Sequence, residues 1–373
     1  MRLLTNDKNS FAYYTITQRF PEIIESVISS NAYNESVNKM LIELKDSIPH
    51  GKLELLKNPL QVSKKINKEI TLNNYTWDNA PFLFVENYLY HKLCEITDYE
   101  NNRIDFFAYK KNKDVIDKMS QMNSAIAEFD RILKIPFEKS LSAVTLLNLK
   151  GNMADLSHLS SLKNNGIKLL IDHSDKLSDK FAHAKCIDII LDNSGEELFY
   201  DLLLTFWILK KTTVETVRLH FKTIPYFVSD ATLSDYGFLM EQLAKNNDNK
   251  DFIQFIQHKV ETGNIILCAN NSWSDGYCFN QLPDKLLNSL NQSDLLIFKG
   301  DLNYRKLVED RNWEYTTKTT DLITYFETDI LIIRVLKSEV AVGLQEKNIP
   351  SRENKEWTYN AEYGVIELCE TKK

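Results

Sequence analysis

The chain has 373 residues, 43% of them apolar and 26% charged, a composition typical of a soluble globular protein rather than a disordered one. Because single cores rarely grow beyond ~250–300 residues, we expect two domains, or one large domain with a substantial appendage. Its 52 acidic side chains outnumber the 45 basic ones, which gives a net charge of −7, and no long basic block occurs. This balance argues against nucleic acid as a partner.

The five cysteines are scattered and form no CxxC pair, which argues against a disulfide framework and against a zinc site. The N-terminal stretch is too polar for a secretory signal. No run approaches the ~18 consecutive apolar residues of a membrane-spanning helix. We therefore expect a cytoplasmic protein without a membrane partner.

Apolar residues at three- and four-residue spacings predict helices in the first part of the chain. The segment 34–48 reads as one amphipathic helix, with Asn34 placed to cap its start. The segments 81–96 and 114–133 carry similar periodicity, and Pro81 suits a first helical turn. We therefore predict a helical domain over residues 1–155.

From about residue 165 the pattern changes to short apolar runs separated by helical segments. The runs cover residues 167–172, 187–192, 216–221, 264–270, 294–301 and 329–337. Because they are nearly continuously hydrophobic, we expect strands covered on both faces in a mostly parallel sheet. The predicted fold class is α/β, with a three-layer α/β/α sandwich over residues 156–373 preceded by the helical N-terminal domain. The segment 224–230 reads either as a loop or as a bent extension.

Polar residues stand where several of these runs end, and parallel sheets bind ligands outside the carboxyl ends of their strands. Asp192 and Asn193 follow one run, Asp230 ends the segment 224–230, and Lys337 ends the last run. Two carboxylates and a carboxamide are hard ligands that suit Mg²⁺, Mn²⁺ or a similar divalent ion. We expect Asp192 at a solvent-facing strand end, with Lys337 as a second positive partner for a phosphoryl group.

A turn at Ser194-Gly195 precedes a helix that we expect to begin near Glu196. The free backbone N–H groups of its first turn would point at an anion, and phosphate is the obvious candidate. Three common motifs are absent from the sequence. The ten glycines form no GxG arrangement, which excludes a dinucleotide-binding fingerprint, and neither the GxSxG nucleophile motif nor the HExxH zinc motif occurs. The seven histidines show no metal-ligand spacing.

Four segments in order, "LDNSGEEL", "KTIPYFVSDAT", "FKGDLNYRKLVEDRNWE" and "IRVLKSEVAVGL", resemble the damage-control phosphatase family, long labelled domain of unknown function 89. The similar subfamily includes human acidic residue methyltransferase and fungal sugar-phosphate phosphatases. The resemblance implies a helical domain packed on an α/β/α domain. It also implies a metal-dependent phosphatase acting on small sugar phosphates such as fructose 1-phosphate and fructose 6-phosphate.

The resemblance also implies roles for individual residues. A divalent ion, Mn²⁺, Co²⁺, Ni²⁺ or Mg²⁺, is expected on Asp192, Asn193 and Asp230, and catalysis on Asp192 and Lys337. The implied substrate contacts are Glu197, Asp301, Leu302, Asn303, Tyr304, Arg305 and Lys337. Asp192 either orients the attacking water or attacks phosphorus itself, and both routes stay open.

The chain departs from the subfamily signature Arg-Thr-x-Lys at Val335, so a hydroxyl contact is expected to be missing. Glu86, Asn152 and Asp155 also lie in matching segments, where helix caps or interdomain hydrogen bonds explain them equally well.

Two other functions remain as alternatives. The first is an S-adenosylmethionine-dependent protein-glutamate O-methyltransferase, but the segment "LIDHSDK" lacks the glycine-rich turn that usually follows the first strand of such enzymes. The second is a noncatalytic sugar-phosphate sensor, which would keep the anion site without metal chemistry. The presence of all three expected metal positions argues against a sensor.

Overall fold

The apolar runs of the second half form a sheet in the computed structural model, which describes residues 2–57, 61–151 and 166–371. Asn152 and Asp155 lie outside the described residues. The strands in this part of the chain are β1 (Lys168–Asp172), β2 (Cys186–Ile190), β3 (Thr216–Phe221), β4 (Ile265–Ala269), β5 (Leu295–Lys299), β6 (Ile330–Val335) and β7 (Tyr363–Cys369). They pair in the order β1-β7-β6-β5-β2-β3-β4. Every neighbouring pair is parallel except β6 and β7, which are antiparallel.

Helices precede the sheet and then alternate with its strands. The first set is α1 (Phe11–Tyr14), the π-helix η1 (Thr15–Arg19), α2 (Phe20–Ser30), α3 (Glu35–Asp46), α4 (Gln61–Asn73), α5 (Phe82–Ile96), α6 (Tyr99–Asn102), α7 (Ala108–Lys134) and α8 (Phe137–Lys150). The second set is α9 (Ser178–His183), α10 (Glu196–Lys211), α11 (Leu233–Leu243), α12 (Lys250–Glu261), α13 (Asp284–Leu290), α14 (Gly300–Leu307) and α15 (Thr319–Leu322). Short 3-10 turns are η3 (Ser174–Lys176), η4 (Asn247–Asn249), η5 (Asn271–Ser274), η6 (Phe279–Gln281), η7 (Glu346–Asn348) and η8 (Glu356–Thr358).

Alternating side chains of the buried strands enter two different cores. In β5, Leu296 and Phe298 join a core with residues of α2, α5 and α14, whereas Leu295 and Ile297 join a core with residues of α7, α8 and α10. Both faces of the sheet are therefore covered, which explains why the strands read as continuous apolar runs. The predicted α/β fold class is confirmed.

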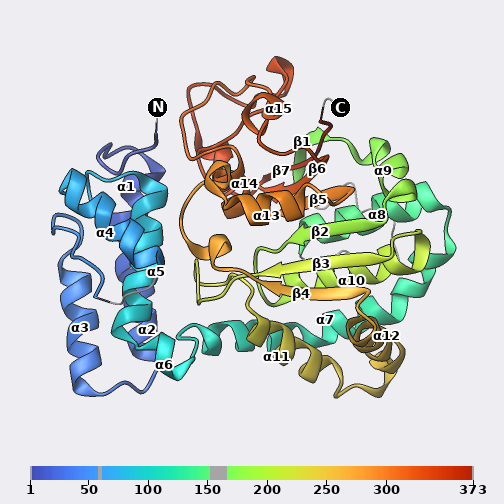
Figure 1. The fold of residues 1–373 in the computed structure, drawn as a ribbon, viewed down its shortest axis with the longest axis horizontal. Helices are drawn as coiled ribbons and strands as arrows, with labels where there is room; N and C mark the ends of the chain where they lie inside the picture. The colour runs from blue at the N-terminus through green and yellow to red at the C-terminus, as the bar shows by residue number, and fades with distance from the viewer. Residues whose placement is uncertain (1, 58–60, 152–165, 372–373) are drawn as a thin grey trace.

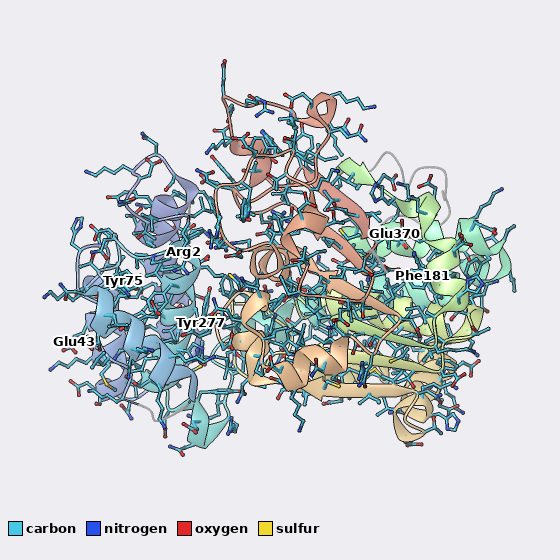
Figure 2. The ribbon with its side chains drawn as sticks, turned by 45° about the horizontal axis from the view of Figure 1, so that its top comes forward. Arg2, Glu43, Tyr75, Phe181, Tyr277 and Glu370 are labelled. Atoms are coloured by element: carbon cyan, nitrogen blue, oxygen red, sulfur yellow. The ribbon has the colours of Figure 1, made fainter. Side chains whose placement is uncertain are left out.

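The N-terminal helices lie at one end of the molecule, and α7 extends from them along the sheet (Figure 1). Glu43 and Tyr75 lie on this helical part, far from Phe181 and Glu370 (Figure 2). Although α7 and α8 belong to the first 155 residues, they share a core with the sheet. The division of the chain near residue 155 therefore stays a prediction.

Local sequence signals account for several helix ends. The Asn34 side chain accepts a hydrogen bond from the Val37 N–H and caps α3 as expected. Pro81 stands one residue before α5, at its cap position. The segment 224–230 forms a loop, which resolves the two alternatives for it. Within the described residues, no helix is long and apolar enough to cross a membrane.

Candidate active site

Two chain segments meet just beyond the carboxyl ends of β2 and β3. Asn193 and Asp230 form an isolated antiparallel bridge. The Ala231 N–H donates to the Asp192 carbonyl at 2.8 Å, and the Ser194 N–H donates to the Ser229 carbonyl at 2.7 Å. The structure thus brings Asp192, Asn193 and Asp230 together at one edge of the sheet, as the sequence predicts.

These residues face a cavity of about 430 Å³. Its polar lining residues include Arg19, Glu22, Glu86, Lys110, Asp192, Asn193, Ser229, Asp230, Asp301, Arg305 and Lys337. A smaller pocket of about 160 Å³ reaches Glu197 and Lys299 and shares Asp192, Asp301 and Lys337 with the main cavity. Asp192 therefore lies between two hollows.

The sequence places Asp192 at a solvent-facing position, and that expectation is wrong. Its side chain is only 5% exposed, because α14 begins directly against it. A Cβ added at Gly300 would lie 1.9 Å from Asp192 Oδ2, so only glycine fits beside this carboxylate. The Gly300 φ of +76° also favours glycine.

The Asp192 carboxylate is incompletely satisfied. Its Oδ2 accepts a hydrogen bond from Asn193 Nδ2 at 3.0 Å, whereas Oδ1 has no hydrogen-bond partner among the described residues. Burial, with the charges of Glu197 and Asp230, holds the pKa of this group well above its usual value, although nearby lysines oppose the shift. A buried carboxylate oxygen without a partner is costly, which marks Asp192 as a position kept for a ligand.

Asp230 shows the same features. Its Oδ2 has no hydrogen-bond partner in the described part of the chain and lies 3.5 Å from Lys222 Nζ. Burial raises the pKa of Asp230 to about 6 against the opposing charges of Lys222 and Lys111. Both carboxylates of the predicted metal set are thus buried, close to cations and short of donors.

Just before α10, the Asn193 side chain connects the carboxylates of Asp192 and Glu197. Its Nδ2 donates to Asp192 and, at 2.8 Å, to Glu197 Oε2. Burial opposes ionisation of Glu197, yet Lys299 and Lys337 hold the pKa of Glu197 below its usual value. The ionised Glu197 carboxylate therefore holds the Asn193 amide by accepting its hydrogen bond. Gly195, with a φ of +68°, makes the turn that places Glu197 in the first turn of the helix.

A strained turn supports Asn193 from the other side. Phe227 and Val228 adopt φ values of +42° and +69°, and the left-handed region is unfavourable for bulky and β-branched residues. The Phe227 ring stacks on Tyr90 with centroids 4.9 Å apart. Ser229, which follows Val228, donates a hydrogen bond from its Oγ to Asn193 Oδ1 at 2.6 Å. Strain of this kind persists where surrounding packing enforces it, often at functional sites.

Buried lysines stand behind the site, and the sequence assigned no role to them. Lys299 Nζ lies 3.2 Å from Glu197 Oε1 and 3.0 Å from Asp201 Oδ1. Lys111, from α7, donates at 2.8 Å to the Asp230 carbonyl. The strand-end pattern points to Lys299 and would also have pointed to Lys222, whereas nothing in the sequence around Lys111 points to the site.

The predicted substrate segment 301–305 divides into two groups. Asp301, Leu302 and Arg305 line the main cavity. Asn303 and Tyr304 do not line it: Asn303 donates to the carbonyls of the β2 end, and the Tyr304 hydroxyl accepts from the Val342 N–H at 3.0 Å. The structure places these two side chains in supporting contacts, and substrate contact by them stays an untested prediction.

Firm anchors hold the cavity-lining members of this segment. Asp301 Oδ1 accepts hydrogen bonds from Arg334 Nε at 2.8 Å and from the Lys337 N–H at 2.9 Å. Arg305 pairs with Glu86 at 2.6 Å and with Asp310 at 2.8 Å. Glu86 therefore lines the cavity as the partner of a buried arginine.

Lys337 is exposed and lines both hollows beside Asp192. Its ammonium group makes no hydrogen bond or ion pair with any residue that the structure describes. Val335, which stands where the subfamily has threonine, lines the smaller pocket. The predicted loss of a hydroxyl contact there is compatible with this position and stays untested.

The side chains at this edge of the sheet supply only part of the donor set that a divalent cation requires. Among residues 2–57, 61–151 and 166–371 no group of three or more His, Cys, Asp or Glu side chains could hold a metal ion. The predicted set contains two carboxylates, and their free oxygens suit a hard cation that keeps water or phosphate oxygens as further ligands. Asn193 directs its nitrogen at Asp192, so its amide group would have to turn over to act as a third ligand.

Comparison with known proteins agrees with this architecture. The model of the damage-control phosphatase ARMT1-like domain matches residues 15–351. The chain is 30% identical to damage-control phosphatase ARMT1 of Bos taurus over an alignment of 439 residues that covers 98% of each protein. It is 29% identical to the Homo sapiens protein of the same name, over 97% of this chain and 96% of that one.

A solved structure has the same fold. The crystal structure of a DUF89 family protein from Pyrococcus horikoshii gives a TM-score of 0.50 at 16% identity, covering 92% of this chain and 97% of that one. Such a likeness concerns the fold alone, while the family model extends over most of the chain. The chain belongs to the damage-control phosphatase ARMT1-like family.

Proposed function

We propose that the protein is a metal-dependent phosphatase of small sugar phosphates such as fructose 1-phosphate and fructose 6-phosphate. One observation carries the proposal: the buried carboxylates Asp192 and Asp230 leave oxygens without partners in the cavity that Lys337 also lines. A phosphoryl group would be repelled by these carboxylates alone. The arrangement becomes favourable when a cation lies between the carboxylates and the phosphate.

Asp192 and Asp230 would hold that divalent cation, with Asn193 as a further ligand once its amide turns over. When bound, the cation supplies Lewis-acid polarisation of the phosphoryl group and neutralises its charge. Mn²⁺, Co²⁺, Ni²⁺ and Mg²⁺ are the candidates, because each accepts carboxylate oxygen with open positions.

The residues of the chain then divide the remaining tasks. The unpaired ammonium of Lys337 contacts phosphoryl oxygens and stabilises the charge that develops on them. Glu197, held ionised by Lys299, accepts the Asn193 amide in the free protein, and this hydrogen bond would break when the amide turns over toward the cation. Asp192 Oδ1, the oxygen without a partner, either orients the attacking water or attacks phosphorus itself.

Asp301 and Arg305 are suited to the sugar. Both are held by fixed partners, Asp301 by Arg334 and Arg305 by Asp310, so they can face the hydroxyl groups of a substrate without reorganisation. A cavity of about 430 Å³ has the size of small-molecule sites.

Phosphate release tests the proposal. The protein is stripped with a chelator and assayed on fructose 1-phosphate, fructose 6-phosphate and other phosphorylated sugars, with each of the four metals and with none. We expect turnover only with metal. Absence of turnover with every metal and sugar would overturn the phosphatase. Retained binding of fructose 6-phosphate in that case would favour the sensor, and methyl transfer to protein glutamate would favour the methyltransferase.

A further inference from the structure

A second cavity of about 690 Å³ lies beside the main cavity. Its lining includes Lys8, Phe11, Tyr14, Arg19, Lys337 and Tyr359, and we call this group the annex. Phe11, Arg19 and Lys337 line both cavities. The annex and the main cavity are therefore adjacent, with Arg19 and Lys337 at their common boundary.

The charge of the annex differs from that of the main cavity. The main cavity combines basic residues with five carboxylates, whereas the described lining of the annex contains the cations Lys8, Arg19 and Lys337 and no carboxylate. None of the three makes an ion pair with a described residue. Two acidic side chains next to the annex bond to backbone N–H groups of its lining: Glu339 Oε1 accepts the Phe11 N–H and Asp7 Oδ1 accepts the Asn9 N–H, both at 3.0 Å. Three basic side chains thus share one hollow without bound counter-charges.

The walls of the annex are fixed by their own contacts. Phe11 stacks on Tyr359 with centroids 4.9 Å apart and an interplanar angle of 19°. The Arg19 guanidinium lies 5.7 Å from the Phe11 ring centroid, and Ser10 caps α1 by accepting the Tyr13 N–H at 3.1 Å. Because the two rings already stack on each other, an additional aromatic ring is not what the annex lacks. Its unmet feature is negative charge.

We propose that the annex binds a second phosphoryl group of the substrate, so that the protein prefers small sugars carrying two phosphates. This inference rests on the proposed phosphatase function, because it takes Asp192 and Lys337 as the place of the first phosphoryl group. Lys8 and Arg19 then hold the second group. Each cation gains a charge-assisted hydrogen bond that it lacks in the free protein.

Steady-state kinetics with fructose 1,6-bisphosphate and fructose 1-phosphate test the annex in the wild type and in Lys8→Gln. Lys8 lines the annex alone, so the change spares the main cavity. We expect KM for the bisphosphate to rise roughly 3- to 10-fold in Lys8→Gln, with kcat and the monophosphate KM unchanged. The difference should shrink as salt is raised from 0.05 to about 0.5 M.

Lys39→Gln is the matched control, since Lys39 is an exposed lysine of α3 that pairs at 3.9 Å with Glu43, outside both cavities. Lys39→Gln should leave KM and kcat unchanged for both substrates. Equal kinetics of Lys8→Gln and the wild type on both sugars would overturn the annex while leaving the phosphatase in place. If the wild type hydrolyses neither sugar, the phosphatase fails. Calorimetric binding of fructose 1,6-bisphosphate then decides the annex: weaker binding by Lys8→Gln supports it, and equal binding overturns it.

Discussion

Asp188 and Asp192 are four residues apart, one within β2 and one just beyond its end, and both are buried. Asp188 lies within β2, where it is in register with Arg218 of β3. Its carboxylate accepts hydrogen bonds from Arg218 at 2.7 Å, from His220 at 2.6 Å and from Ser293. Burial opposes its ionisation, yet these donors hold the pKa of Asp188 below its usual value.

Asp192 lies two residues beyond Ile190, the last residue of β2, and has the opposite environment. It receives one hydrogen bond from Asn193, and burial with neighbouring carboxylates raises its pKa. Burial alone therefore does not separate a structural carboxylate from a functional one. The separating feature is the number of donors that the fold supplies, and at Asp192 the fold leaves room for a ligand instead.

The largest expected effect comes from the matched pair Asp192→Asn and Asp188→Asn. Asp192→Asn should lower kcat by ~10³-fold or more, because it removes a cation ligand and the unpaired Oδ1 charge. Its thermal stability should be unchanged or higher, since a repulsion with Glu197 and Asp230 disappears. Asp188→Asn should lower the free energy of unfolding by about 3 kcal/mol, because Arg218 loses its buried partner.

Phosphate release and thermal melting measure this pair. The Asp188 variant is assayed at a temperature at which it stays folded, where its kcat should be close to that of the wild type. A stable, fully active Asp192→Asn would show that Asp192 has no role in catalysis. A fully stable Asp188→Asn would show that the Asp188 charge does not stabilise the fold.

Lys337→Ala should have the next largest effect. The ammonium has no partner to lose in the folded chain, so the melting temperature should barely move, while kcat/KM falls ~30- to 1000-fold through loss of ~2–4 kcal/mol of transition-state stabilisation. Lys337→Arg should recover only part of the rate, because a planar guanidinium does not replace a compact ammonium. Steady-state phosphate release at saturating Mn²⁺ is the measurement. An unchanged kcat/KM in Lys337→Ala excludes this lysine from the chemistry.

Gly300→Ala tests whether the backbone of α14 positions Asp192, and Gly263→Ala is its control. Both glycines have φ near +77°, at +76° and +78°. A Cβ at Gly263 would meet nothing within 4 Å, whereas one at Gly300 would lie 1.9 Å from Asp192 Oδ2. Gly263→Ala should cost about 1 kcal/mol of stability through backbone strain, and Gly300→Ala should cost more, because its Cβ also displaces Asp192. Gly300→Ala should in addition reduce kcat by roughly 10- to 100-fold, since a displaced carboxylate binds the cation poorly.

Melting curves and phosphate release separate strain from displacement. Equal activity of the two glycine variants would show that the position of Asp192 is not set by α14. Recovery of activity in Gly300→Ala at high metal concentration would support displacement of a ligand.

Much of the fold was predictable because burial leaves a plain pattern in the sequence. Six strands were expected from their continuous apolar runs, and all six are present. The missed strand, β7, contains Gly364 and Glu367, which interrupt its apolar run. It returns antiparallel to β6 and fills the position between β6 and β1, so it leaves the sheet mostly parallel.

The site was predictable only in part, for a physical reason. The rule that ligands bind at the carboxyl ends of parallel strands found Asp192, Asp230 and Lys337, because it depends on local sequence and strand direction. Arg19 and Lys111 reach the site region from helices whose packing no local pattern encodes. The burial of Asp192 also depends on a contact with Gly300, which is more than a hundred residues away.

Glu367 gives the smallest effect and separates a raised pKa from function. Burial raises the pKa of Glu367 to about 7, above an ordinary value of 4.5, although Thr319 donates to its Oε1 at 2.7 Å. It lines neither of the two cavities beside Asp192. A carboxyl whose folded pKa is raised adds stability that is fully present below its unfolded pKa and lost as the pH rises through its folded pKa. The wild type should therefore lose roughly 2 kcal/mol from this group between pH 5 and pH 8, and Glu367→Gln should lose none of it. Urea unfolding of both proteins across this range measures the difference, with kcat in Glu367→Gln expected to equal that of the wild type. Parallel pH profiles of stability would show that Glu367 ionises normally, and a large fall in kcat would mean that a raised pKa by itself identifies functional carboxylates in this fold.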